Sequence, residues 1–135
     1  MPRLHVVAVS ARLPAWAETA CAEYAKRMPR GYAGSRIPLR TERKLRGVLP
    51  KGARVVVLDE RGRDFTTLQF AALLASETAF VIGGADGLAE AAKKDCDLLL
   101  RLSSLTLPHA LAQVMLLEQL YRAASLLSRH PYHRS

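Results

Sequence analysis

The chain has 135 residues, half of them hydrophobic, and carries a net charge of +8. This composition is sufficient for one domain, residues 1–135, with its own core, and it excludes an intrinsically disordered chain. No apolar run approaches the roughly 20 residues of a membrane span and no signal peptide pattern is visible, so we expect a soluble, cytoplasmic protein that contacts no membrane.

The positive charge is concentrated in the basic N-terminal half, residues 1–54. This half contains twelve Lys and Arg against three Asp and Glu, a net charge of +9, whereas residues 55–135 contain eight against nine. Within 26–54, ten cations accompany a single acid, Glu42. A solvated surface is the plain alternative, but cations at this density repel one another unless an anion lies nearby, and nucleic-acid phosphate is the commonest such anion. The charge distribution therefore favours nucleic-acid binding.

The N-terminal part predicts a strand and a helix before a less regular segment. Residues 4–9 form an apolar, β-branched run that is typical of a strand. Pro14 opens a helix that Pro29 and Gly31 end. Its large apolar residues recur every four positions, at Trp16, Ala20, Tyr24 and Met28. The stretch 31–53, rich in Gly and Pro, predicts one short helix near 42–48 and leaves room for a short strand.

The next segments predict buried strands that alternate with helices. Residues 55–58 are a continuous apolar run, which indicates a strand covered on both faces, and residues 59–63 predict a turn. Thr66 or Thr67 is expected to cap a helix that runs through residue 74. Residues 78–82 predict a second buried strand.

The remainder continues the alternation. A glycine turn at 83–87 leads to a short helix at 88–94, and residues 98–102 predict a further strand. The connection 103–108 then leads into a helix of about twenty residues. Strands that alternate with helices predict an α/β fold with a mostly parallel sheet and helices on both faces.

The last helix is more apolar than a surface helix requires. From 110 to 127 nearly every residue outside one arc is apolar, with Gln113 the exception. That arc spans about 120° and consists of Glu118, Gln119, Arg122 and Ser125. A surface helix needs an apolar stripe only a little over ~100° wide. The excess must be covered by the rest of the domain or by the same helix of a second copy, and in so short a chain we favour a homodimer.

Two loops have the composition of ligand-binding segments. The turn 83–87 (GGADG) follows a strand and opens a helix, where glycines permit close approach of a ligand to the backbone, although its spacing is not that of a dinucleotide fingerprint. The connection 103–108 mixes apolar and hydroxyl residues, a composition suited to a flat apolar ring edged by backbone polar groups. The plain alternative is a buried connection in which Ser or Thr caps the next helix and Pro108 occupies its first turn.

No metal site is expected. Cys21 and Cys96 form no C-x-x-C pair and no ligand cluster with the four histidines, so we interpret them as small buried residues in a reducing compartment. The C-terminal tail, 129–135, is more unusual, because its cations, imidazoles and phenol suit stacking on a base and holding phosphate.

Three ordered motifs resemble a known family. They are residues 80–88 (FVIGGADGL), residues 102–109 (LSSLTLPH), and residues 121–123 (YRA) followed by the tail 130–134 (HPYHR). Together they closely resemble the RlmH family, bacterial methyltransferases that act on N3 of a pseudouridine in 23S ribosomal RNA and that belong to the SPOUT (α/β-knot) superfamily. With a similar N-terminus, the resemblance covers most of the chain.

The resemblance implies a fold, a cofactor and partners. The C-terminal segment would be threaded as a trefoil knot, here about residues 78–128, and family members are homodimers packed through this region. S-adenosylmethionine (SAM) would lie against the knot. The matching cofactor-binding positions are Leu58, Gly83, Gly84, Ser103, Ser104, Leu105, Thr106, Leu107 and Pro108. The substrate would be 23S rRNA within the ribosome, with residues 1–54 as its docking surface.

Methyl transfer to a uracil-type N3 requires alignment of the reactants and removal of a proton. The candidates are His109, Tyr132, His133 and Arg134. A histidine would take the proton, Arg134 would meet charge on the base or its phosphate, and Tyr132 would stack. Two alternatives stay open: a knotted tRNA methyltransferase, and a non-catalytic ribosome-binding protein of the same fold.

Overall fold

Five strands form one sheet in a computed structural model, which describes residues 3–9, 12–32, 34–84 and 87–129. Across the sheet the order is β2-β1-β4-β3-β5, and each of these neighbouring pairs is parallel. The strands are β1 (Leu4–Val9), β2 (Gly34–Leu39), β3 (Arg54–Asp64), β4 (Thr78–Ile82) and β5 (Leu98–Arg101). The predicted α/β fold with a parallel sheet is confirmed.

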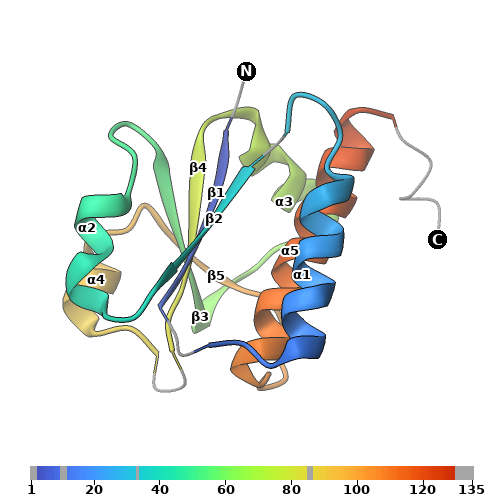
Figure 1. Cartoon of the computed structure of the whole chain (residues 1–135). Helices are drawn as coiled ribbons and strands as arrows, with labels where there is room; N and C mark the ends of the chain where they lie inside the picture. The colour runs from blue at the N-terminus through green and yellow to red at the C-terminus, as the bar shows by residue number, and fades with distance from the viewer. Residues whose placement is uncertain (1–2, 10–11, 33, 85–86, 130–135) are drawn as a thin grey trace.

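Helices cover both faces of this sheet (Figure 1). The α-helices are α1 (Ala15–Arg27), α2 (Leu45–Val48), α3 (Thr67–Ala72), α4 (Glu90–Lys94) and α5 (His109–Leu127), with short 3-10 turns η1 (Glu42–Lys44) and η2 (Leu73–Ala75). Helices α1, α3 and α5 lie on one face, and α2 and α4 lie on the other. The short helix and strand expected within 31–53 are therefore both present.

Two hydrophobic cores follow from the alternation of side chains along the strands. Val56 and Phe80 point into the core beneath α1, α3 and α5, whereas Val57 and Val81 point into the smaller core beneath α2 and α4. All five residues of β4 are buried, because this strand lies at the centre of the sheet with neighbours on both sides. The apolar runs in the sequence thus indicate strands that are covered on two faces.

Helix α3 begins at the expected residue. The Thr66 side chain accepts a hydrogen bond from the backbone N–H of Gln69, and the Gln69 side chain accepts one from the N–H of Thr66. This reciprocal capping box satisfies two backbone donors that a helix N-terminus otherwise leaves free.

The turn predicted at 59–63 is wrong, because the chain stays in β3 through this stretch. Leu58 pairs with Leu100, the chain bulges, and Arg63 then pairs with the same Leu100. Arg101 of β5 binds the Asp64 carboxylate through Nε at 2.7 Å. Pairing with a strand nearly forty residues further on therefore overrides the local turn signal.

The faces of α1 and α5 also differ from the expectation. Trp16, placed on the apolar stripe of α1, is 56% exposed, and Ala17 is the buried residue beside it. On α5, Gln113 and Ser125 are buried, so Ser125 does not belong to a solvent-facing polar arc. Helices α1 and α3 pack against α5 and cover much of its wide apolar surface within the chain. Among the described residues, no helix is both long and apolar enough to cross a membrane.

Candidate functional site

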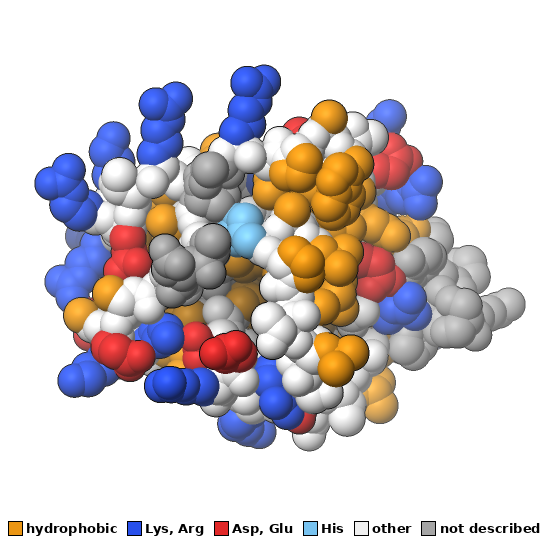
Figure 2. Space-filling model, turned by 90° about the horizontal axis from the view of Figure 1, so that it is seen from below, with side chains coloured by type: hydrophobic (Ala, Val, Ile, Leu, Met, Phe, Trp, Pro, Cys, Tyr) orange, Lys and Arg blue, Asp and Glu red, His pale blue; other side chains and the backbone are white. Residues whose placement is uncertain are grey.

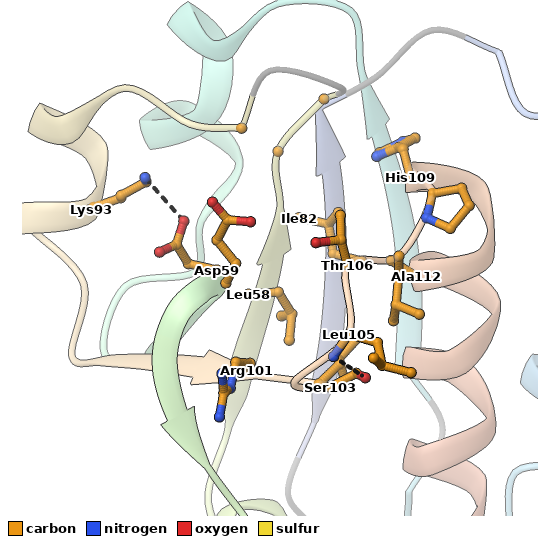
Figure 3. A pocket seen from close by; sticks show the side chains of 17 residues that line it. Leu58, Asp59, Ile82, Lys93, Arg101, Ser103, Leu105, Thr106, His109 and Ala112 are labelled. Carbon is orange, nitrogen blue, oxygen red and sulfur yellow. Dashed lines mark hydrogen bonds and ion pairs between the residues drawn. The ribbon is translucent and has the colours of Figure 1, made fainter.

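The carboxyl ends of β4 and β5, together with the middle of β3, open onto a cavity of about 480 Å³ (Figure 3). Its floor is formed by Leu58 and Ile82, the last apolar residues of two neighbouring strands before the chain leaves their pairing. In parallel sheets the carboxyl edge is the usual place for a ligand, because loops from several strands converge there. The cavity lies within the size range of small-molecule sites.

Most of the expected binding positions converge on this cavity although they are far apart in the sequence. Its lining includes Leu58, Gly83, Gly84, Ser103, Leu105, Thr106, Leu107, Pro108 and His109. Ser104 is not among the lining residues and is exposed. Tyr132, His133 and Arg134 lie outside the described residues, so the structure does not place the tail relative to the cavity.

The glycine turn after β4 is tight enough to require glycine. Gly84 and Gly87 form an antiparallel bridge, in which the Gly87 N–H donates to the Gly84 carbonyl at 2.9 Å, and Gly87 has a φ of +77°. A Cβ on Gly83 would lie 2.7 Å from the carbonyl carbon of Gly87 and 2.8 Å from the nitrogen of Leu88. The backbone of this turn is therefore directly accessible along one wall of the cavity.

The connection between β5 and α5 forms the opposite wall. Ser103 Oγ accepts a hydrogen bond from the Leu105 N–H at 2.9 Å, which folds the start of the connection back on itself. Neither serine nor threonine caps α5, because the N-cap is Pro108, with an extended backbone and no side-chain hydrogen bond. Leu105 is 75% exposed and Thr106 is exposed as well. This wall thus presents apolar side chains together with backbone polar groups.

An ion pair at the cavity rim was not anticipated from the sequence. Lys93 of α4 binds Asp59 at 3.0 Å, and both side chains are largely buried. Burial acts to raise the pKa of Asp59. Hydrogen bonds from Lys93 and from the Arg61 N–H, together with the positive charges of the Lys93 and Arg61 side chains, outweigh burial and lower the pKa. Asp59 directly follows the apolar run of β3, and a carboxylate at the end of such a run was the available signal.

His109 begins α5 at the mouth of the cavity. Its Nε2 lies 2.9 Å from the side-chain nitrogen of the buried Gln113. Burial lowers the pKa of His109, against a backbone hydrogen bond at Gly83 that raises it. The imidazole is therefore neutral at pH 7, and a neutral imidazole is able to accept a proton.

The surface around the cavity divides by side-chain type (Figure 2). Lys and Arg project around the side that carries α2 and α4, and hydrophobic side chains gather on the side of α1 and α5. In the described part of the chain, no three His, Cys, Asp or Glu residues are grouped as metal ligands.

The sequence of this chain matches known methyltransferases over almost its whole length. Residues 2–133 match the family model described as "Predicted SPOUT methyltransferase". Proteins named "Ribosomal RNA large subunit methyltransferase H" from Burkholderia mallei and Burkholderia pseudomallei are 48% identical to it, over 98% of this chain and 99% of their own length.

Solved structures share the fold at much lower sequence identity. A probable methylase family protein from Haemophilus influenzae superposes with a TM-score of 0.64 at 13% identity, over 96% of this chain and 69% of its own. An AdoMet-bound rRNA methyltransferase from Sinorhizobium meliloti superposes with a TM-score of 0.59 at 15% identity, over 90% of this chain and 56% of its own.

Proposed function

Because the chain belongs to the SPOUT methyltransferase family, we propose that it transfers a methyl group from SAM to N3 of a pseudouridine in 23S rRNA of the large ribosomal subunit. One observation carries this proposal: eight of the nine positions that match cofactor-binding residues, drawn from three separate segments, line one cavity. The single catalytic domain, residues 1–135, and the trefoil knot within 78–128 remain predictions of the same resemblance.

The residues of the cavity suit SAM. Leu58, Ile82 and Leu107 would supply apolar surface for a flat adenine ring, and backbone groups of the glycine turn and of 103–108 would be available to its polar edge. A Cβ on Gly84 would approach the Val9 carbonyl oxygen to 3.0 Å, so a larger residue there would require the turn or Val9 to shift by a few tenths of an ångström. When bound, SAM supplies an electrophilic methyl group on a sulfonium.

The chain's own contribution is alignment and proton removal. The walls formed by the glycine turn and by 103–108 would hold the methyl donor in a fixed orientation. His109 is the first candidate base: its imidazole is neutral, and Nε2 would give up the hydrogen bond from Gln113 to accept the N3 proton of the target base. In this proposal the tail residues Tyr132 and Arg134 stack on the base and meet its negative charge, with His133 as the second candidate base.

The RNA would dock on the basic half of the chain. Arg40, Arg43 and Lys44 are exposed and form no ion pair with any described residue. Arg43 and Lys44 lie in η1, directly before α2, and Arg40 lies two residues before η1. Lys and Arg side chains project on the side that carries α2 (Figure 2). Cations without an internal partner are available to phosphate, which makes binding dependent on salt concentration.

We also propose that the protein is a homodimer. Leu105 of the connection 103–108 is 75% exposed, and Leu111 in the first turn of α5 is 37% exposed. Figure 2 shows hydrophobic side chains gathered on this side of the cavity face. A second copy packed here would cover them and would border the cavity mouth.

The test is transfer of labelled methyl from SAM to ribosomes that lack this modification, with free ribosomal RNA and bulk tRNA in parallel. Label on a pseudouridine of the large subunit supports the proposal. Label on tRNA alone would assign the chain to a knotted tRNA methyltransferase. Ribosome binding without any label would indicate a non-catalytic protein of the same fold.

A further inference from the structure

Glu42 is the one acid among the cations of residues 26–54, and it does not pair with any of them. Its carboxylate accepts a bifurcated hydrogen bond from the Ala89 N–H, at 3.1 Å to Oε1 and 3.2 Å to Oε2. Glu42 lies in η1, and Ala89 is the N-cap of α4. The contact therefore joins the basic segment to a residue 47 positions away.

Ala89 lies close to the cavity along the chain. It comes two residues after Gly87, which lines the cavity and bridges to Gly84. Between them Leu88 is buried, and its backbone nitrogen is close to Gly83. The hydrogen bond to the Ala89 N–H thus restrains the backbone just after the glycine turn. Glu42 is in this way connected through the backbone to the cavity wall at Gly87.

Two further features connect η1 and α2 to α4. Arg46 of α2 binds Asp95 at the end of α4. Leu45 of α2 is buried in the same core cluster as Leu88. The segment that exposes Arg40, Arg43 and Lys44 therefore meets the segment after the glycine turn through the Glu42 hydrogen bond at its start, a shared core cluster and an exposed ion pair at its end.

We propose that Glu42 is a positioning residue that couples RNA docking on η1–α2 to cofactor binding at the glycine turn. This inference rests on the function proposed above. Each ligand restrains Gly83, Gly84 and residues 87–89, so the second ligand binds to a wall that is already restrained and loses less conformational entropy. The two ligands would then strengthen each other's binding without touching.

A pair of variants with the same charge separates this role from simple electrostatics. Glu42→Ala removes the carboxylate and its hydrogen bond. Glu42→Gln removes the same charge but keeps an oxygen that accepts from Ala89. If Glu42 only weakened phosphate binding, both variants would bind ribosomes more tightly and neither would alter cofactor affinity. Glu23→Gln on α1, remote in sequence and paired with Arg27, is the charge control.

The measurements are calorimetric affinity for S-adenosylhomocysteine (SAH), and co-sedimentation with unmodified ribosomes with and without saturating SAH. In the wild type we expect SAH to raise ribosome affinity about fivefold. Glu42→Ala should lower SAH affinity about fivefold, abolish this enhancement and speed amide exchange at Ala89. Glu42→Gln should keep SAH affinity within about twofold of the wild type, as should Glu23→Gln.

The outcomes distinguish this inference from the proposed function. If the wild type binds SAH and methylates ribosomes but SAH leaves ribosome affinity unchanged, the function stands and the coupling is wrong. Equal SAH affinity in Glu42→Ala and Glu42→Gln, with matching unfolding midpoints, would likewise overturn the role of the hydrogen bond. If the wild type binds no SAH, both proposals fail.

Discussion

Replacing Gly83 by alanine tests whether the glycine turn is as tight as its geometry indicates. The new Cβ would lie 2.7 Å from the carbonyl carbon of Gly87 and 2.8 Å from the nitrogen of Leu88, whereas ordinary van der Waals contact begins at 3.4 Å. The backbone of 87–88 would have to retreat by about 0.7 Å, the difference between 3.4 and 2.7 Å. Overpacking of this kind typically costs about 1–3 kcal/mol.

The expected result is a free energy of unfolding lowered by about 1–3 kcal/mol in urea denaturation. SAH affinity, measured by calorimetry, should fall about tenfold, because the displaced backbone is a wall of the cavity. Gly47→Ala is the control, since a Cβ at this helical position in α2 meets no atom within 4 Å. It should gain about 0.5–1 kcal/mol from the helix preference of alanine.

Unchanged stability and unchanged SAH affinity in Gly83→Ala would refute this reasoning, because they would show that 87–88 moves freely. A loss of stability with full SAH affinity would refute only the second step, namely that the glycine turn contacts the cofactor.

Three further predictions concern single side chains. Ser125→Ala should raise the free energy of unfolding by about 1 kcal/mol, because the buried Ser125 hydroxyl has no hydrogen-bond partner among the described residues; a decrease in urea denaturation would contradict this. Thr66→Ala should lower the free energy of unfolding by about 1 kcal/mol, because it removes the capping box with Gln69, whereas Thr67→Ala should have a smaller effect in the same assay. The folded pKa of His109 is below its ordinary value of 6.5, because burial outweighs the hydrogen bond that raises it. Since the unfolded chain binds the proton more readily, the free energy of unfolding should fall as the pH drops through 6.5 toward the folded pKa. His109→Gln should remove this contribution to the dependence of the free energy of unfolding on pH. An NMR titration that places the pKa of His109 at or above 6.5 would contradict it.

Strands β1, β4, β5 and the first half of β3 were predictable because each is a short apolar run in a chain whose helices carry a different period, whereas β2 has no such run. Strand β4 coincides with the expected 78–82, and Thr66 identifies the start of α3 through local capping chemistry. These signals depend only on neighbouring residues. They can therefore be recognised from the sequence without knowledge of the tertiary structure.

The errors occur where distant partners decide the structure. Residues 59–63 have the composition of a turn, but Asp64 and Arg101 bind each other and keep the strand extended. On α5, the burial of Ser125 depends on which helices pack beside it, and periodicity contains no information on those neighbours.

The candidate site was predictable only in part for the same reason. The glycine turn and the connection 103–108 are each unusual as local sequence, and they form facing walls of the cavity. The ion pair between Asp59 and Lys93 joins two segments that the sequence does not mark as neighbours. A single charged residue after a strand is too common a pattern to identify a site.

The strand order also determines when the protein is able to fold. Strand β1 pairs with both β2 and β4, and β4 inserts between β1 and β3, so β3 has no partner until residues 78–82 have been synthesised. Strand β5 follows at 98–101, and α5 then covers the core. Pairings between segments this far apart form slowly, and unpaired edges stay exposed meanwhile. A nascent chain of this protein therefore completes its sheet only after residue 101 has been synthesised.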